Sequence, residues 1–206
     1  MYMRVTRFTS STPIDDKRIA EGGERLAAAF GQMPGYLGWS ALLDRASGKA
    51  ASVTYWADAE SMQASEEAGA AVRARVASEG ADIRDVQRYE RLIQERVGTP
   101  QSGLFARVTN FSMAPERIDE LIAHMKEVSV PQAKAQPGFR AFLVSANRET
   151  GQVGVASVWE SEAAREASNM ALGDERRQTM ERFGATLESM ETYEVVAADV
   201  KLPAPA

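Results

Sequence analysis

Hydrophobic and polar residues alternate near the N-terminus and then change to a helical period, which predicts a strand followed by a helix. A proline suits the first turn of this helix, because the N–H that proline lacks would have no helical partner there. A Pro-Gly pair ends the helix, and two strands around a glycine turn precede a second helix and a last strand. The predicted elements are the strand Met3–Thr9, the helix Pro13–Phe30, the strands Tyr36–Asp44 and Ala50–Ala57, a helix from Asp58 and a strand through Tyr89.

The second half of the chain shows the same order of patterns. Its first helix carries buried-face residues at the three-and-four spacing, namely Ile118, Leu121, Ile122 and Met125. Pro131 is expected to kink or break the end of this helix, because proline removes a backbone donor. The predicted elements are the strand Leu104–Ser112, the helix Pro115–Ala135, the strands Phe139–Ala146 and Val153–Glu160, a helix from Ser161 and a strand through Tyr193.

The two halves align as copies of one module. A shift of 103 residues matches about sixty positions without a gap, and a shift of 104 continues the alignment after one inserted residue. A tryptophan, a Pro-Gly-aromatic triplet and a Tyr-Glu pair all fall in register, so we infer an internal duplication. The matches include Arg4-Val5-Thr6 with Arg107-Val108-Thr109, Pro34-Gly35-Tyr36 with Pro137-Gly138-Phe139, Trp56 with Trp159, and Tyr89-Glu90 with Tyr193-Glu194.

The order β-α-β-β-α-β in each copy predicts an α+β fold made of two tandem ferredoxin-like repeats. Such a repeat has a four-stranded antiparallel sheet with both helices on one face. The other face would leave apolar side chains exposed, so the two copies are expected to pack sheet to sheet as an internal pseudo-dimer. The predicted boundaries are residues 1–95 for the first repeat, 96–103 for a linker, 104–199 for the second repeat and 200–206 for a flexible tail.

Composition narrows the classes of function. The net charge is −5 without a basic cluster, which disfavours nucleic-acid binding because that interaction needs a concentrated positive surface. The chain contains no cysteine, which excludes disulfides and thiolate chemistry. No apolar stretch is long enough to span a membrane, and the N-terminus shows no signal-peptide pattern, so we expect a cytoplasmic protein without a membrane partner.

Two motifs per copy resemble those of a known family. The first is a Pro-Gly-aromatic triplet after the first helix. The second is a strand that ends in tryptophan and is followed by the start of a helix with acidic residues and alanine. In the second copy they read Gln136-Pro137-Gly138-Phe139 and Val158-Trp159-Glu160-Ser161-Glu162-Ala163-Ala164. The chain thus resembles the antibiotic biosynthesis monooxygenase (ABM) family of dimeric α/β barrels, once per repeat. The resemblance implies that the two repeats form an intrachain dimeric α/β barrel, and it covers both quinone-forming monooxygenases and haem-degrading enzymes.

The haem-degrading members imply an asparagine on the first strand, a tryptophan at the end of the third and an iron-binding histidine on the second helix. Asn110 and Trp159 match the first two positions, but the second helix of this copy has no histidine. The only histidine, His124, lies on the first predicted helix, where a position at the surface or at the helix–sheet seam is expected. We therefore rank haem degradation below the other readings.

The cofactor-independent members imply a monooxygenase that acts on an aromatic or polyketide-type small molecule without metal or flavin, because the substrate supplies the electrons. Such a site needs a dry pocket and hydrogen-bond donors for a developing anion. The donors available in the second copy are Asn110, Trp159, Arg107 and Tyr193, and those in the first copy are Arg4, Trp56, Trp39 and Tyr89. We take the four residues of the second copy as the candidate site. The asparagine that this subgroup carries four residues before the tryptophan is Ser52 in one copy and Val155 in the other.

Structural interpretations compete with these roles. Tryptophans at strand ends commonly fill cores, and Arg4 and Arg107 could form cross-strand ion pairs with Glu90 and Glu194. The alternative function is accordingly a non-catalytic small-molecule-binding or stress-associated pseudo-dimer, either monomeric or a homodimer of itself. If one copy is active, the second is favoured, because it alone holds Asn110.

Overall fold

The computed structural model describes residues 1–201 as an α+β protein, and the predicted tail lies outside these residues from position 202 onward. Backbone contacts divide the chain into two compact units. Unit 1 holds Met1–Tyr89, Pro100–Gly103 and the chain from Glu194, and unit 2 holds Glu90–Thr99 and Leu104–Tyr193. Within the described residues, no helix is long and apolar enough to cross a membrane.

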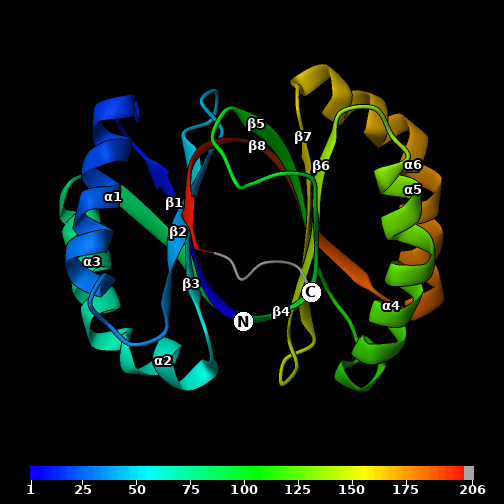
Figure 1. The fold of residues 1–206 in the computed structure, drawn as a ribbon, viewed down its shortest axis with the longest axis horizontal. Helices are drawn as coiled ribbons and strands as arrows, with labels where there is room; N and C mark the ends of the chain where they lie inside the picture. Colours follow the sequence, from blue (N-terminus) through cyan, green and yellow to red (C-terminus); the bar gives the residue numbers. More distant parts are fainter. Residues whose placement is uncertain (202–206) are drawn as a thin grey trace. The chain divides into compact units, whose positions relative to one another are not determined.

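Unit 1 is an antiparallel sheet with its helices on one face (Figure 1). Strand β3 lies between β1 and β2, and the second half of β8 extends the sheet beside β2. The elements are β1 (Tyr2–Ser10), α1 (Asp16–Phe30), β2 (Tyr36–Leu43), β3 (Lys49–Trp56), α2 (Ala59–Ala64), α3 (Glu66–Ser78) and β4 (Ala81–Arg96), whose second half belongs to unit 2.

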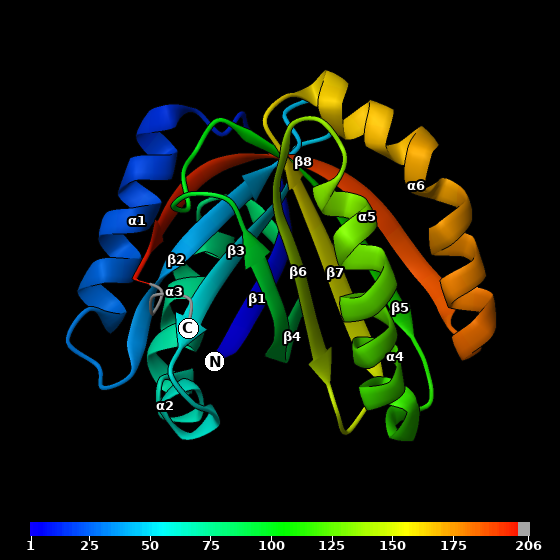
Figure 2. The ribbon, with the colours of Figure 1, turned by 45° about the vertical axis from the view of Figure 1, so that its right-hand side comes forward.

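Unit 2 repeats this arrangement (Figure 2). Strand β7 lies between β5 and β6, and the second half of β4 extends the sheet beside β6. The elements are β5 (Leu104–Ser112), the short 3₁₀ turn η1 (Pro115–Arg117), α4 (Ile118–His124), the π-helical turn η2 (Met125–Ser129), α5 (Val130–Lys134), β6 (Phe139–Asn147), β7 (Gln152–Trp159), α6 (Glu162–Phe183) and β8 (Thr186–Val200).

The strands are hydrogen-bonded in the closed order β1-β3-β2-β8-β5-β7-β6-β4, which is the connectivity of an eight-stranded barrel. Together with the β-α-β-β-α-β order of each repeat, this confirms the predicted fold class. The last strand of each repeat is shared: residues 90–96 of β4 pair with β6, and residues 194–200 of β8 pair with β2.

This sharing of strands contradicts the predicted pairs of Arg4 with Glu90 and of Arg107 with Glu194. Glu90 instead pairs with Arg148 at 2.8 Å, within unit 2. In unit 1, Glu194 pairs at 2.7 Å with Arg45, the equivalent of Arg148. The prediction was wrong because each glutamate follows the point at which its strand joins the sheet of the other unit.

Three helix boundaries differ from the prediction. Helix α1 begins at Asp16 rather than at Pro13, because the side chain of Asp15 caps it by accepting a 2.9 Å hydrogen bond from the N–H of Arg18. The second helix of unit 1 is broken at Ser65 into α2 and α3. In unit 2 the break expected at Pro131 is absent: the chain stays helical to Lys134, and the π-helical turn Met125–Ser129 lies immediately before α5.

Candidate functional site

A cavity of about 60 Å³ lies between the sheet and the helices of unit 2. Its sheet side is formed by alternate residues of β5 and β7, and its helix side comes from α4, η2 and α6. Most of the wall is apolar, and a few charged and hydroxyl groups interrupt it. These polar wall residues are Arg107, Thr109, Ser129, Ser157, Glu175, Arg176 and Thr179.

Arg107 supplies a buried positive charge to this cavity. Its side chain is only 4% exposed, and β5 directs it toward α6. The guanidinium donates to the hydroxyl of Ser168 at 3.3 Å and to the backbone carbonyl of Arg165. Burial, and then the nearby charge of Arg176, lower the pKa of Arg107 to about 10. The group therefore remains protonated at neutral pH, and a bound anion would offset its unfavourable surroundings.

Glu175 supplies a carboxylate to the same cavity. It lies on α6 one turn before Thr179, and both side chains line the wall. Its Oε1 atom accepts hydrogen bonds from the hydroxyl of Ser129 at 2.7 Å and from that of Thr179 at 2.9 Å. The cavity thus places a proton acceptor and the Arg107 cation in one largely apolar space.

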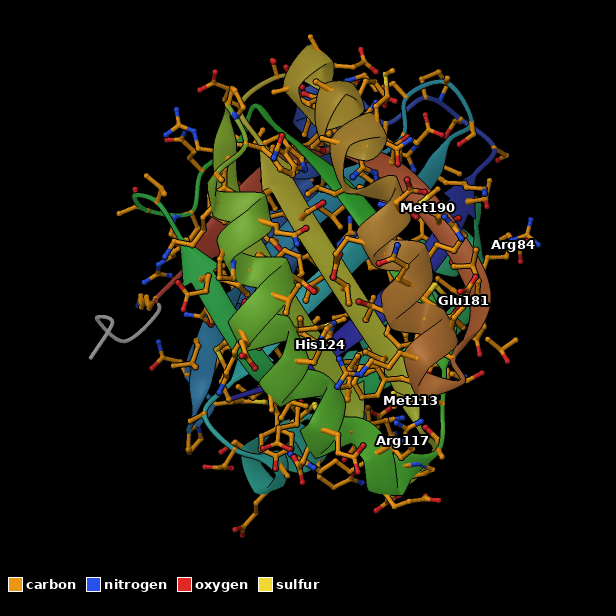
Figure 3. All side chains as sticks on the ribbon, turned by 90° about the vertical axis from the view of Figure 1, so that its right-hand side faces the viewer. Arg84, Met113, Arg117, His124, Glu181 and Met190 are labelled. Atoms are coloured by element: carbon orange, nitrogen blue, oxygen red, sulfur yellow. The ribbon has the colours of Figure 1, made fainter. Side chains whose placement is uncertain are left out.

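His124 continues this hydrogen-bond chain away from the cavity. Figure 3 shows it on α4 beside α6, and its Nε2 atom lies 3.0 Å from the hydroxyl of Thr179. Arg182 can only donate, so His124 Nδ1 accepts from it at 3.3 Å and the neutral ring carries its proton on Nε2. Glu175, Thr179 and His124 therefore form a continuous path of hydrogen bonds from the cavity to the seam between α4 and α6.

Trp159 packs in the core on the helix side of the sheet. It is completely buried, it meets the ring of Phe139 edge to face at 5.9 Å, and its indole N–H donates to Ser157 at 3.1 Å. Trp56 repeats this geometry in unit 1, where its N–H donates to Thr54 at 3.1 Å. The duplicated contacts support a scaffold role for both tryptophans.

Asn110 and Tyr193 lie on the other face of the sheet from Arg107. Successive side chains of a strand point to opposite faces, and Asn110 is three positions after Arg107. The amide of Asn110 donates to the hydroxyl of Ser189 at 2.9 Å, and Tyr193 donates to Glu191 at 2.8 Å. The structure thus separates the four predicted site residues: Arg107 and Trp159 lie on the helix side, and Asn110 and Tyr193 do not.

The family that the sequence resembles includes haem-degrading enzymes. In this chain, the side chains of α6 do not supply a ligand for a haem iron. Asn169, on α6, uses its side-chain carbonyl to accept a 2.9 Å hydrogen bond from Arg176. His124 has hydrogen-bond partners at both ring nitrogens, as described above, and comes from α4. We therefore derive no step through haem.

Glu175, Ser129 and Thr179 were not identified from the sequence. A signal was available in the alignment of the repeats, because the equivalent positions in unit 1 are the apolar residues Val72, Leu26 and Val76. Glu175 and Thr179 also have the spacing of neighbours on one helix face. Polar residues that replace apolar ones on the buried face of a duplicated helix are the pattern that would have indicated this site.

The fold and the helix–sheet cavities define a protein of the ferredoxin-like α/β-barrel class. Within it, residues 104–171 match the model of the antibiotic biosynthesis monooxygenase family, which confirms the resemblance and places the match on the second repeat. Two uncharacterized proteins of Mycobacterium tuberculosis (strain H37Rv) are similar over 98% of this chain. One is 26% identical and is covered over 91% of its length, and the other is 22% identical and is covered over 86%.

Several solved structures share the fold. A protein described as anthrone oxidase-like superposes with a TM-score of 0.68 at 21% identity, covering 100% of this chain and 96% of its own. A haem-degrading enzyme from Listeria monocytogenes gives a TM-score of 0.55 at 10% identity, with 93% and 98% covered. A monooxygenase-like protein from Listeria innocua gives 0.54 at 12% identity, with 94% of each chain covered. At these identities the similarity establishes the fold alone.

Proposed function

We propose that unit 2 is an oxygenase that acts on a small aromatic molecule and uses the substrate as the source of electrons. The substrate class is a phenol or anthrone-like ketone that forms a stabilised anion after losing one proton. Only its reacting edge would enter the cavity, because a volume of about 60 Å³ is too small for a fused-ring molecule. That anion reduces O₂, one oxygen atom enters the substrate, and the other leaves as water while the substrate is oxidised to a quinone. The chain then has to remove a proton, stabilise an oxyanion and exclude water.

The observation that carries this proposal is that Arg107 and Glu175 line the same cavity. Glu175 is the proposed base, because a carboxylate in an apolar space can take a proton from a weakly acidic C–H or O–H group. Arg107 is the proposed stabiliser of the resulting oxyanion, since a buried guanidinium interacts with an anion more strongly than a hydrated one does. The anthrone oxidase-like neighbour supports the choice of substrate class, although the assignment to this chain is our own.

The proton taken by Glu175 leaves with the product: the carboxylic acid returns it to the oxygen atom that is released as water, and Glu175 becomes ionised again. The hydrogen bonds from His124 Nε2 to Thr179 and from Thr179 to Glu175 hold the carboxylate in place. Asn110, Trp159 and Tyr193 have no place in these steps. In this proposal they support the sheet rather than contact the substrate.

Oxygen uptake with a panel of anthrones and hydroquinones tests the proposal. We expect uptake above the buffer rate with the unaltered chain, and a fall of about 100-fold or more in Glu175→Gln, which keeps the shape but cannot accept the proton. Glu181→Gln is the matched control, because Glu181 lies on the same helix with its carboxylate exposed. Absence of uptake with the unaltered chain, or full activity in Glu175→Gln, would contradict the proposal and favour a non-catalytic binding protein.

A further inference from the structure

Unit 1 contains a larger version of the same cavity, of about 130 Å³. Its lining residues come from the sheet and from helices α1 and α3. The extra space comes from two glycines: Gly22 replaces Met125, and Gly69 replaces Leu172 at the equivalent positions. A cavity of about this size in a protein core is large enough to admit a six-membered carbon ring.

Arg4, the equivalent of Arg107, lines this cavity and is only 3% exposed. Its Nη2 atom donates to the carbonyl of Met62 at 2.7 Å and to the hydroxyl of Ser65 at 3.0 Å. Its Nε and Nη1 atoms are buried and have no hydrogen-bond partner among the described residues. Nη1 lies beside Gly69, another residue of the cavity wall. A buried N–H without an acceptor is unfavourable, so these atoms mark a place for one.

The local charge also favours an anion. Glu66 is the carboxylate beside Arg4, at 3.1 Å, and it is shared with Arg73 at 2.5 Å and with Arg88 at 2.8 Å. One negative charge therefore serves three guanidinium groups. An incoming carboxylate would meet an excess of positive charge at the polar end of the cavity and could accept from the unpaired nitrogens of Arg4.

The groups that make the unit 2 cavity a candidate catalytic site are missing at the equivalent positions of unit 1. Val72, Val76 and Leu26 stand where Glu175, Thr179 and Ser129 stand in unit 2, and all three line the cavity. Unit 1 thus keeps the cation and the apolar wall but has no base at that place. Its walls suit a ligand with an apolar body and one anionic end.

We propose that unit 1 is a separate binding site for a small amphipathic carboxylic acid, with the carboxylate on Arg4 and the apolar body between α1 and α3. This site goes beyond the proposed oxygenase function and does not depend on it. The two copies would then have diverged into a binding site and a reaction site.

Calorimetric titration of the full chain with benzoate, and with benzyl alcohol as the uncharged comparison, tests this site. We expect benzoate to bind at least about tenfold more tightly than benzyl alcohol, because only the anion can use the charge of Arg4. Arg4→Gln should abolish that preference. Equal binding of the two compounds, or no binding of benzoate, would overturn the proposal.

If the Arg4→Gln variant does not fold, a second pair of variants still tests the site. Gly22→Met puts into unit 1 the residue found in unit 2, and a Cβ atom at Gly22 meets nothing within 4 Å, so the chain should fold with a smaller cavity. We expect it to lose benzoate binding, while Glu21→Met, the same side chain at the neighbouring exposed position, retains it. Binding that survives Gly22→Met but disappears in Arg107→Gln would assign the acid to unit 2 and refute a site in unit 1. Oxygen uptake, measured in parallel, reports on the oxygenase proposal separately.

Discussion

The hydroxyl of Thr179 donates a 2.9 Å hydrogen bond to the carboxylate of Glu175, one turn earlier on α6. The same oxygen accepts from the Nε2 atom of His124 at 3.0 Å, so Thr179 links the cavity to the histidine. Because this hydroxyl donates to Glu175 and accepts from His124, it holds the carboxylate in one orientation. The first repeat has valine at this position and neither of the two partners.

Replacing Thr179 with valine should therefore interrupt the path while keeping the shape of the side chain. We expect oxygen uptake to fall by about tenfold or more and the free energy of unfolding to fall by about 1–2 kcal/mol, because Glu175 and His124 each lose a partly buried hydrogen bond. Urea denaturation and oxygen uptake measure the two effects. Thr179→Ser keeps the hydroxyl and should keep the activity. A valine variant that is less stable but fully active would leave Thr179 with a structural role only.

The charge of Arg107 should make a stability contribution that depends on pH. Burial, and then the nearby charge of Arg176, lower its folded-state pKa to about 10, well below the ordinary value for arginine. The unfolded chain therefore binds this proton more tightly. The cost of burying the charge is fully present below pH about 10 and decreases as the pH rises above the folded-state pKa. Relative to Arg107→Met, the unaltered chain should gain about 1 kcal/mol of stability between about pH 8 and about pH 10.5.

Urea denaturation at both pH values checks this prediction. Arg84→Met, at an exposed arginine, controls for the effect of the alkaline buffers on unfolding. A difference between the unaltered chain and Arg107→Met that stays constant, or that moves against the unaltered chain as the pH rises, would contradict a lowered pKa of Arg107.

Features of the fold could be predicted from the sequence where a pattern of neighbouring residues determines them. The alternation of hydrophobic and polar residues and the Pro-Gly pairs are local patterns, and they predicted both hairpins. The repetition of these patterns in the second half of the chain predicted the fold class. The partners of Glu90 and Glu194 depend on where β4 and β8 pass from one sheet to the other, which no local pattern records. The break expected at Pro131 was wrong for a related reason, since the chain there continues from a π-helical turn into α5.

For the candidate site, the sequence predicted Arg107 together with Asn110, a residue on the other face of the same strand. The spacing between Arg107 and Asn110 is odd, and strand geometry alone assigns them to opposite faces. Glu175 and Thr179 lie on α6, which carries many charged residues. The pattern of polar residues along this helix therefore does not show which polar side chains are buried. Only comparison with the apolar equivalents in the first repeat distinguishes them.

Trp159 should prove to be a structural residue. Its ring fills the core of unit 2 against Phe139, and Trp159→Phe would leave part of that space empty and the hydroxyl of Ser157 without its indole donor. We expect the free energy of unfolding to fall by about 1–3 kcal/mol, with oxygen uptake per folded molecule unchanged. Trp56→Phe should give a similar loss in unit 1. Lost uptake at unchanged stability would instead place the indole in the chemistry.

Gly151, in the turn between β6 and β7, should be the most sensitive turn position of unit 2. Its φ is 75°, and a Cβ atom there would lie 2.0 Å from the backbone carbonyl oxygen of Met113, which cannot move without disturbing the end of β5. Gly98 has the same φ of 75° but nothing within 4 Å of the added carbon. Gly98→Ala should thus cost about 1–2 kcal/mol for the left-handed conformation alone. Gly151→Ala should cost about 3 kcal/mol or more, because overlap adds to the same backbone strain. Thermal or urea unfolding of both variants separates the two causes, and equal losses would show that the turn moves freely away from Met113.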